Sequence, residues 1–523
     1  MEVCMDSKDA VAIDSPEEMW GRFDAEVMTL LPDWKRRLED EPAELERIEG
    51  DVQRTCQRGG AMLVAGLLAE VSGQPAVQQT ADRLRRQAAR PLRPPEKRTV
   101  QIQLLGGLLL WITTLYCGPR ARTGNGRGKQ GGGLYNELAV FGFGKGCSPA
   151  LQSLVARQAA LCPSMQMAQQ ELLRSGLKLD IKAVRRIAEQ TGLQMLTHRK
   201  RELLAWRAGR LPAGKQLAGK RVAVQLDGGR TRLRENGPPP PKNRKKGERR
   251  KFDTPWREPK LLIIFTLDEQ GRMQRKESVL IDGTFAGPDH LAELVAYHLH
   301  RLGAAQAESL TFSADGAPWI WDRLGWIVEQ VGIDATRVSE VLDFCHAAHH
   351  ISLALAALSL SEQERRPLYR EMRKRLRQGR WRGVVDDLSE LAQSAAEDPD
   401  VHREIAYLRR HGETGRMSYP TFRSRGLPLG SGAIESSIRR VINLRLKGNG
   451  IFWVKMNAEA MLVLRATLLA DNWDAMLSRT RASLARDRRL DWEWDAPDLS
   501  KARPEATQSE STPNRATACE ASD

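Results

Sequence analysis

Short apolar runs typical of β-strands alternate with helical patterns between residues 215 and 358, and this alternation constrains the fold more than any other feature. Three runs come first: RVAVQLDGG, KLLIIFTLDEQGR and RKESVLIDG. Helices are expected at Pro288–Leu302 and Trp319–Val331, each next to a further strand, ESLTFSADG or RVSEVLDFCH. A three-stranded meander followed by alternating helix and strand predicts an α/β fold, with a mixed sheet flanked by helices.

Two of these strands end in an acid that is followed by glycine. Asp227 ends the first strand and Asp315 ends the fourth, and sites in open α/β sheets lie at strand ends. A third acid, Glu435, lies in the first turn of a helix expected after Gly430-Ser431-Gly432. Three carboxylates together can hold two divalent cations, and their hard oxygens favour Mg²⁺, with Mn²⁺ as a substitute. We therefore expect Asp227, Asp315 and Glu435 to be metal ligands and catalytic residues.

The alternatives to this site are ordinary structural roles. An Asp-Gly pair also marks turns, and Asp282-Gly283 is interpreted as one. Glu435 alone fits a helix start at which the helix dipole favours an acid. Its segment nevertheless has an apolar stripe at helical spacing, which predicts a buried face, formed by Ile434, Ile438, Val441 and Ile442. The cations expected to bind backbone phosphates beside it are Arg439, Arg440 and Lys447.

The charge of the chain indicates a polyanionic partner. The 523 residues carry a formal net charge of +15, and the cations are clustered, which favours nucleic acid over a merely solubilising surface. Seven of the ten residues 242–251 are basic, in a proline-rich excursion near Asp227 that cannot be a central strand. We expect this loop to contact phosphates, although a solvated loop is the alternative. Its expected DNA-binding residues are Lys242, Arg244, Lys245, Lys246, Arg249 and Arg250.

Residues 146–200 predict three helices. The third, DIKAVRRIAEQTG, is capped by Asp180 and expected to end at Gly192. Arg185 and Arg186 on this helix favour a helix-turn-helix that binds DNA. A helical hairpin with exposed arginines and no DNA partner is nearly as good an interpretation.

The other segments complete the expected organisation. The N-terminal region is helical and charged, with a strand pair in Leu104–Cys117 that turns at Gly106-Gly107. Seven scattered cysteines and the polar start of the chain favour a cytoplasmic, nucleoid-associated protein. The expected regions are residues 1–145 with a basic Gly-rich linker, 146–200 for DNA binding, 215–358 for the first part of the core, 359–425 for a helical insertion, 426–480 for the second part of the core, and 497–523 for a disordered tail.

Four motifs together resemble the DDE transposases of bacterial insertion sequences, in the Kra-type branch related to Mutator-like elements. They are LDGGR with Asp227, FSADGAPWIW with Asp315, LDFCHAAHH, and GLPLGSGAIESSIRRVINLRLKGNGIFW with Glu435. The resemblance implies an RNase H-like core and an all-helical insertion between the last two acids, which are about 120 residues apart. It also implies metal-dependent cleavage and strand transfer at terminal inverted repeats, with double-stranded repeat and target DNA as partners and a homo-oligomer on the DNA.

The motif from Asp343 to His346 resembles the D/C-x-x-H motif of Mutator-related transposases, so His346 is expected to contact DNA or to order the active site. The whole run RVSEVLDFCH is expected to be strand, with a helix from Ala347. A zinc site made by Cys345, His346, His349 and His350 is a weaker interpretation, because no second ligand pair is evident. Relatives also carry a Cys-pair element before the helix-turn-helix, whereas this chain has one cysteine there.

Two other functions remain open at this stage. The same fold can be a structure-selective DNA nuclease, and a non-catalytic DNA-binding regulator would keep the helix-turn-helix without needing three placed carboxylates. Inverted repeats that flank the reading frame would distinguish a transposase from a nuclease. Trp319 and Trp321 can stack on a displaced base, but a place in the core of the helix that follows is the better interpretation.

Overall fold

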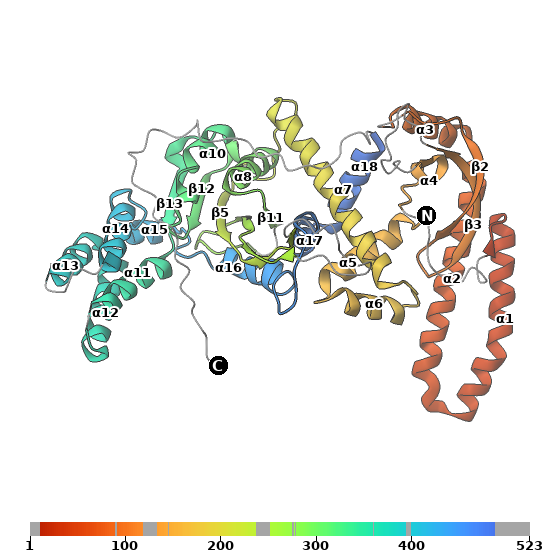
Figure 1. Cartoon of the computed structure of the whole chain (residues 1–523), viewed down its shortest axis with the longest axis horizontal. Helices are drawn as coiled ribbons and strands as arrows, with labels where there is room; N and C mark the ends of the chain where they lie inside the picture. Colours follow the sequence, from red (N-terminus) through yellow and green to blue (C-terminus); the bar gives the residue numbers. More distant parts are fainter. Residues whose placement is uncertain are drawn as a thin grey trace, which may run out of the picture.

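The computed structural model describes residues 11–88, 91–118, 133–144, 146–236, 252–274, 277, 279–358, 360–393 and 399–486. The basic loop 242–251, nearly all of the Gly-rich linker and the tail 497–523 lie outside these residues. The molecule is elongated, with a helical hairpin at one end, the sheet near the middle and a helical bundle at the other end (Figure 1).

The N-terminal region combines long helices with a small sheet. Helices α1 (Pro16–Asp40) and α2 (Leu45–Ser72) form the hairpin, and α3 (Pro75–Arg86) follows. The predicted turn at Gly106-Gly107 is confirmed, and β3 (Leu109–Cys117) lies in the predicted run. Its partner β2 (Glu96–Gln103) lies before that run, so the predicted position of the first strand is wrong. Gly106 and Gly107 make the turn with φ angles of 94° and 81°, a region that favours glycine. The short elements beside this pair are β1 (Val11–Ala12), β4 (Leu134–Tyr135) and α4 (Asn136–Val140).

Among the described residues, no single helix is both long enough and apolar enough to cross a membrane. The segments Pro42–Ser72 and Pro75–Arg86 reach the required length and composition only as a pair, and that pair is bent by 79°.

Three helices connect this region to the sheet: α5 (Pro149–Leu161), α6 (Met165–Arg174) and α7 (Ile181–Arg207). Asp180 caps α7 as predicted, because its carboxylate accepts the Ala183 N–H at 2.5 Å. The predicted end at Gly192 is wrong, since α7 is 27 residues long and ends at Arg207. Gly192 is instead where α7 crosses α17 (Lys455–Leu469): a Cβ there would lie 2.6 Å from the Ala460 carbonyl oxygen. Its missing side chain permits close helix packing.

The central sheet has the order β11-β10-β5-β12-β13. Strand β10 pairs antiparallel with both β11 and β5, whereas β12 lies parallel to both β5 and β13. The predicted meander and the mixed sheet are therefore confirmed. The strands are β5 (Arg221–Gly228), β10 (Lys260–Thr266), β11 (Leu280–Thr284), β12 (Ser309–Ala314) and β13 (Val338–Leu342).

Three local predictions in this region are wrong. Asp282 is not in a turn, because it lies inside β11 and is buried. The last strand stops at Leu342, and helix α11 (Phe344–Ala357) starts three residues earlier than Ala347, with Asp343 as its N-cap. The helix expected at Trp319–Val331 is two helices, α9 (Pro318–Trp321) and α10 (Leu324–Val331).

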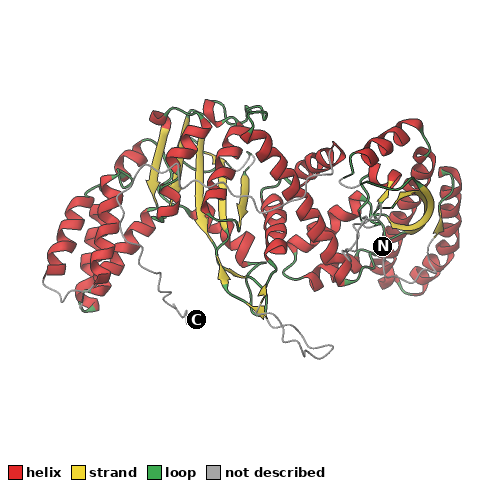
Figure 2. Ribbon diagram, turned by 45° about the horizontal axis from the view of Figure 1, so that its top comes forward, coloured by secondary structure: helices red, strands yellow, loops and turns green. Residues whose placement is uncertain are grey.

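Helices cover both faces of the sheet (Figure 2). Alternate residues of a strand face opposite ways, so Val222, Val224 and Leu226 of β5 join the core with α8 (Pro288–Leu302) and α10. Ala223 belongs to the opposite core, which contains residues of α5, α7 and α17. Asp227 has the same parity as Ala223 and faces this second side.

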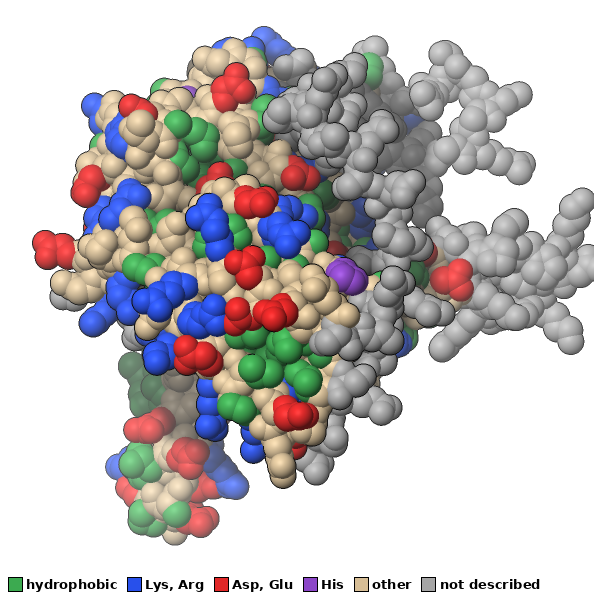
Figure 3. All heavy atoms as spheres, turned by 90° about the vertical axis from the view of Figure 1, so that its left-hand side faces the viewer, with side chains coloured by type: hydrophobic (Ala, Val, Ile, Leu, Met, Phe, Trp, Pro, Cys, Tyr) green, Lys and Arg blue, Asp and Glu red, His purple; other side chains and the backbone are tan. Residues whose placement is uncertain are grey.

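The predicted insertion is all-helical in its described part, with α12 (Glu362–Arg377), α13 (Trp381–Gln393), α14 (Pro399–Glu413) and α15 (Tyr419–Ser424). It packs on the sheet domain through contacts between α14 and α11. The end of the molecule that it forms carries acidic and basic side chains interspersed among the described residues (Figure 3). This view does not have the single-sign surface typical of a nucleic-acid interface.

Candidate active site

Asp227 and Asp315 lie next to each other at the ends of neighbouring strands. Strands β5 and β12 are parallel, and Leu226 pairs with Ala314 in their register. Asp227 and Asp315 each come one residue later, so the same edge of the sheet presents both carboxylates. Asp227 accepts the Gly228 N–H at 2.6 Å, and Asp315 accepts the Ala317 N–H at 3.0 Å. Each acid thus keeps one oxygen bonded to its own turn.

Glu435 reaches this edge on α16 (Gly432–Ile438), which lies beside β5 and β10. The predicted apolar stripe is buried as expected, and it holds the helix against the sheet. The helix continues as a π-helical turn, η5 (Arg439–Asn443). Such turns are rare and often occur at functional sites. The side chain of Glu435 is 53% exposed, so it remains accessible to a ligand.

The three acids interact electrostatically. Burial first, and then the charge of Asp315, raises the pKa of Asp227 to about 6. Glu435 adds to this rise, whereas the Gly228 N–H and His346 oppose it. A shift caused in part by both other acids places each of them near Asp227. His346 lies beside the third acid, since its Nε2 is 3.8 Å from Glu435 Oε1.

Asp343 links two of the elements that carry these groups. It is buried at the N-terminus of α11, and it accepts the backbone N–H of His346 at 2.9 Å. Its other carboxylate oxygen accepts the backbone N–H of Ser431 and also its hydroxyl, at 2.8 Å. The hydroxyl in turn lies 3.2 Å from Glu435 Oε1. Asp343 therefore positions both His346 and the turn before Glu435.

The sequence prediction missed two buried polar residues, Gln225 and Ser313. The Gln225 amide donates to the Gly430 carbonyl at 3.0 Å and accepts the Ile434 N–H at 3.1 Å. Ser313 also donates to Gly430, at 3.2 Å. Each lies two residues before a candidate acid, Asp227 or Asp315, and therefore on the same face of its strand. A polar residue two positions before a strand-end acid is the signal that could have revealed them.

The chemistry of the donor set fits a hard divalent cation. Asp227, Asp315 and Glu435 supply only carboxylate oxygens, which suit Mg²⁺ or Mn²⁺. Within the described residues, no group of three or more His, Cys, Asp or Glu side chains is arranged as a formed metal site. One oxygen of each carboxylate is hydrogen-bonded locally, to Gly228, Ala317 or Ser431. A bound cation would compete with these local hydrogen bonds.

The zinc interpretation has no support in the geometry. Cys345 and His349 are exposed, and His350 is paired with the buried carboxylate of Glu404 and stacked on Tyr407 at 3.5 Å. These three side chains do not gather with His346 into a metal cluster in the described part of the chain. Trp321 is buried and donates its indole N–H to the Asp315 carbonyl at 2.8 Å, so its expected place in the core is confirmed. The partly buried Trp319 packs against the same core.

The predicted phosphate-binding cations fall in two places. Arg439, Arg440 and Lys447 are exposed after the Glu435 helix. Arg185 and Arg186 are exposed in the first turns of α7, outside the acidic site. The loop residues from Lys242 to Arg250 lie outside the described residues.

The neighbouring Arg445 is not available for DNA. It is buried, donates to the Ala159 carbonyl at 3.2 Å and lies 5.0 Å from the ring of Trp453. Burial lowers its pKa to about 10.

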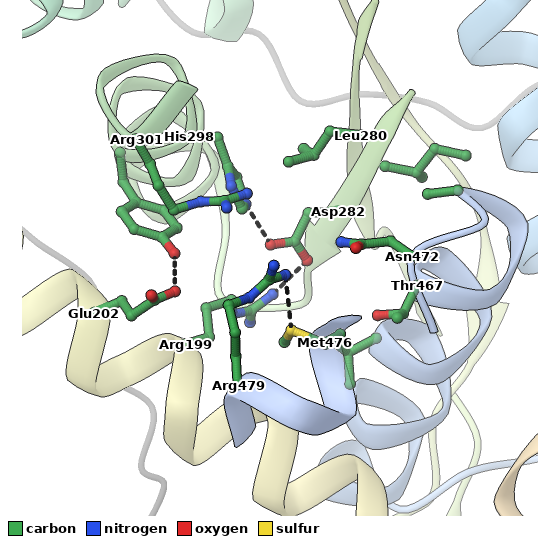
Figure 4. Close-up of a pocket in the computed structure, with 14 residues that line it drawn as sticks. Arg199, Glu202, Leu280, Asp282, His298, Arg301, Thr467, Asn472, Met476 and Arg479 are labelled. Carbon is green, nitrogen blue, oxygen red and sulfur yellow. Dashed lines mark hydrogen bonds and ion pairs between the residues drawn. The ribbon is translucent and has the colours of Figure 1, made fainter. Parts of the chain in front are cut away.

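A second polar cluster lies at the pocket shown in Figure 4. Arg199 donates to Asp282 at 2.6 Å and to Glu459 at 3.0 Å, and all three side chains are buried. His298 Nε2 lies 2.8 Å from Asp282. Although burial opposes ionisation, Arg199 and His298 hold the pKa of Asp282 well below its usual range. The cluster joins α7, α8, β11 and α17, which is a structural role.

Comparisons with known proteins give no further guidance, since no family model, no curated protein and no solved structure matches this chain.

Proposed function

We propose that this protein is a DDE transposase that cuts DNA at terminal inverted repeats and joins it to target DNA. The observation that carries the proposal is the placement of Asp227 and Asp315 at one edge of the sheet with Glu435 on the helix beside it. Burial first, and then the charges of the other two acids, raise the pKa of Asp227 to about 6. Such a cluster of carboxylates is stable only if protons or cations compensate its charge. Phosphodiester cleavage by a metal-dependent enzyme requires this kind of site.

The topology supports an RNase H-like core for the proposed enzyme. Its three leading strands are antiparallel neighbours and its last two are parallel, with the first strand in the centre. The acids come from the first strand, the end of the fourth strand and a late helix. The helices α12–α15 lie between the last two acids, where the resemblance implies an insertion. Each of these features was expected from the motifs.

The residues of the proposed site divide the work. The three carboxylates would hold Mg²⁺, which when bound activates the attacking oxygen and stabilises the leaving oxygen. Asp343, Gln225 and Ser313 fix the turn that orients Glu435. The exposed Arg439, Arg440 and Lys447 would bind backbone phosphates beside the carboxylates. Exposed arginines at the start of α7 would contact the terminal repeat. The protein would be cytoplasmic and associated with the nucleoid, where a homo-oligomer would hold both ends of the element.

The decisive test uses DNA that carries the sequence flanking the reading frame. Purified protein should nick this DNA at the repeat boundary in Mg²⁺ and join the released 3′ end to a plasmid. The Asp315→Asn variant should bind the same DNA and do neither. Cutting without joining, at branched rather than repeat DNA, would identify a structure-selective nuclease. Specific binding with no cutting in Mg²⁺ or Mn²⁺ would identify a regulator and overturn the proposal.

A further inference from the structure

A narrow β-ribbon leaves the sheet just after Asp227 (Figure 2). Strands β6 (Thr231–Arg232) and β9 (Trp256–Arg257) pair at its base, and β7 (Glu235–Asn236) pairs with β8 (Phe252–Asp253) further out. The chain alternates along the base: Thr231 and Leu233 are buried, whereas arginines are exposed at positions 230, 232 and 234. One face of the ribbon is therefore anchored and the other is cationic.

The buried face fixes the ribbon to the segment that follows Glu435. Thr231 donates its hydroxyl to the Leu446 carbonyl at 2.6 Å, and the Arg234 N–H donates to the Trp453 carbonyl at 2.7 Å. Arg232 is five residues after Asp227, so its Cα lies at most about 18 Å from that of Asp227 even if the chain is fully extended. The exposed face is thus held within a few nucleotides of the carboxylates.

Exposed aromatic rings lie among these arginines. Trp256 is 41% exposed, and the guanidinium groups of Arg230 and Arg232 lie 5.4 and 5.0 Å from its ring centre. Lys447, from the segment after Glu435, lies 5.9 Å from the same ring. Arg234 lies 4.1 Å above the ring of Phe252, which is 36% exposed. Cations and aromatic faces therefore alternate on one surface.

These cations have no acid to neutralise them within the described part of the chain. Of the two acids that face each other across the outer strands, Glu235 is paired with Arg257 at 2.7 Å, and Asp253 forms no ion pair with Arg230, Arg232, Arg234 or Lys447 among the described residues. Cation–π contacts alone stabilise a surface ribbon only weakly, and three close cations around one ring repel each other. A polyanion would remove this repulsion. A duplex backbone would use only the cations, because its bases are stacked inside, whereas an unpaired base can also use the exposed ring.

We propose that this ribbon, defined by Arg230, Arg232, Arg234, Phe252 and Trp256, binds unpaired DNA bases. Trp256 is the stacking platform, and the arginines contact the phosphates on either side of the stacked base. The proposal rests on the proposed function only for the origin of the unpaired strand, which would be the opened DNA end beside Asp227. The binding itself needs neither metal nor cleavage.

The test measures binding of the full-length protein in EDTA by fluorescence anisotropy. The two probes are a labelled oligothymidine of about 20 nucleotides, longer than usual single-strand sites, and a blunt duplex of the same length. Trp256→Ala should weaken oligothymidine binding about tenfold, as expected when one base stack is removed, and leave duplex binding within about twofold. Trp256→Tyr should restore most of the affinity. Trp20→Ala is the matched control, because Trp20 is 51% exposed but lies on α1.

Other results would overturn the stacking site. Equal weakening on both probes would make the ribbon a phosphate clamp, and no weakening on either would leave it without a DNA role. A thermal unfolding curve of Trp256→Ala that matches wild type excludes misfolding. If the curves differ, the oligothymidine affinity of Trp256→Tyr tests the stacking site instead. Because no step requires cleavage, loss of the stacking site and failure of the transposase proposal are separate outcomes.

Discussion

Ser431 donates both its backbone N–H and its hydroxyl to one oxygen of Asp343, a buried carboxylate 88 residues earlier in the chain. The same hydroxyl lies 3.2 Å from Glu435 Oε1. A hydroxyl has one proton, so the two carboxylates compete for it. The turn before α16 is therefore tied to the start of α11 from one side and to Glu435 from the other. Changing this hydroxyl should affect the position of Glu435 more than the fold.

Ser431→Ala removes the hydroxyl and keeps the backbone N–H bond to Asp343. We expect DNA binding to stay within about twofold and single-turnover cleavage to slow about 10- to 100-fold, because small displacements of catalytic groups are that costly. Ser431→Thr should restore most of the rate. Ser436→Ala, on the exposed side of the same helix, is the control. Unchanged cleavage by Ser431→Ala would show that Glu435 does not depend on this hydroxyl.

Glu435→Gln keeps the size of the side chain but removes one negative charge. The buried stripe of α16 does not involve this exposed group, so folding and repeat binding should be unchanged. Cleavage and joining in Mg²⁺ should fall at least about 1000-fold, with a trace restored by Mn²⁺. Glu329→Gln, at an exposed position of α10, should cleave like wild type. Normal cleavage by Glu435→Gln would refute the three-carboxylate site.

Arg185→Ala combined with Arg186→Ala tests the start of α7, where both side chains are exposed. Binding to the terminal repeat should weaken by about 1–3 kcal/mol for each arginine that hydrogen-bonds a base, and binding to random duplex by much less. Electrophoretic mobility shifts at several salt concentrations measure both. Arg174→Ala, exposed at the end of α6, is the control. Equal weakening on both DNAs would mean that these arginines bind only the phosphate backbone.

Asp227→Asn should stabilise the metal-free protein at neutral pH. The pKa of Asp227 is about 6 in the fold and about 3.9 when unfolded, so the folded state binds more protons between these values. Stability contributed by this group is present below about pH 4 and is lost as the pH rises to about 6. In EDTA, Asn should add on the order of 2 kcal/mol at pH 7.5 and nothing at pH 4. Urea unfolding at both pH values measures this, and an equal gain at both would contradict it.

Glu459→Gln should damage the fold rather than the chemistry. Glu459 is fully buried and accepts from Arg199 at 3.0 Å and from the Phe285 N–H at 2.8 Å. Removing one charge of a buried pair destabilises by about 3–5 kcal/mol, here at the lower end because Asp282 still pairs with Arg199. Urea unfolding measures the decrease, with Glu329→Gln expected within about 0.5 kcal/mol of wild type. A variant as stable as wild type would show that this ion cluster is dispensable.

The strands, the helix that follows the first three of them and the three acids could be predicted from local patterns. An apolar run that ends in an acid can be recognised without knowing the tertiary contacts. Pro288–Leu302 starts and ends as the pattern predicts. Tertiary packing decided the rest. Gly192 was predicted as a helix end, but its lack of a side chain serves the close packing against Ala460. Asp282 was predicted in a turn, but its charge is buried in a strand because Arg199 pairs with it. The spacing of two between the arginines at 230, 232 and 234 is present in the sequence. Only the pairing of the ribbon strands brings Trp256 among them.

The length of α7 has a mechanical consequence. Its 27 residues extend roughly 40 Å as one rod. The exposed arginines of its first turns lie roughly 20 Å along this rod from the buried ion cluster at Arg199. The crossing at Gly192 leaves no room for slippage against α17. If the proposed DNA contact at the first end is correct, a rigid helix rather than a flexible linker would hold that DNA relative to the sheet. A chimera that replaces the region 146–200 with another DNA-binding region would have to keep the length of this helix to preserve the orientation relative to the sheet.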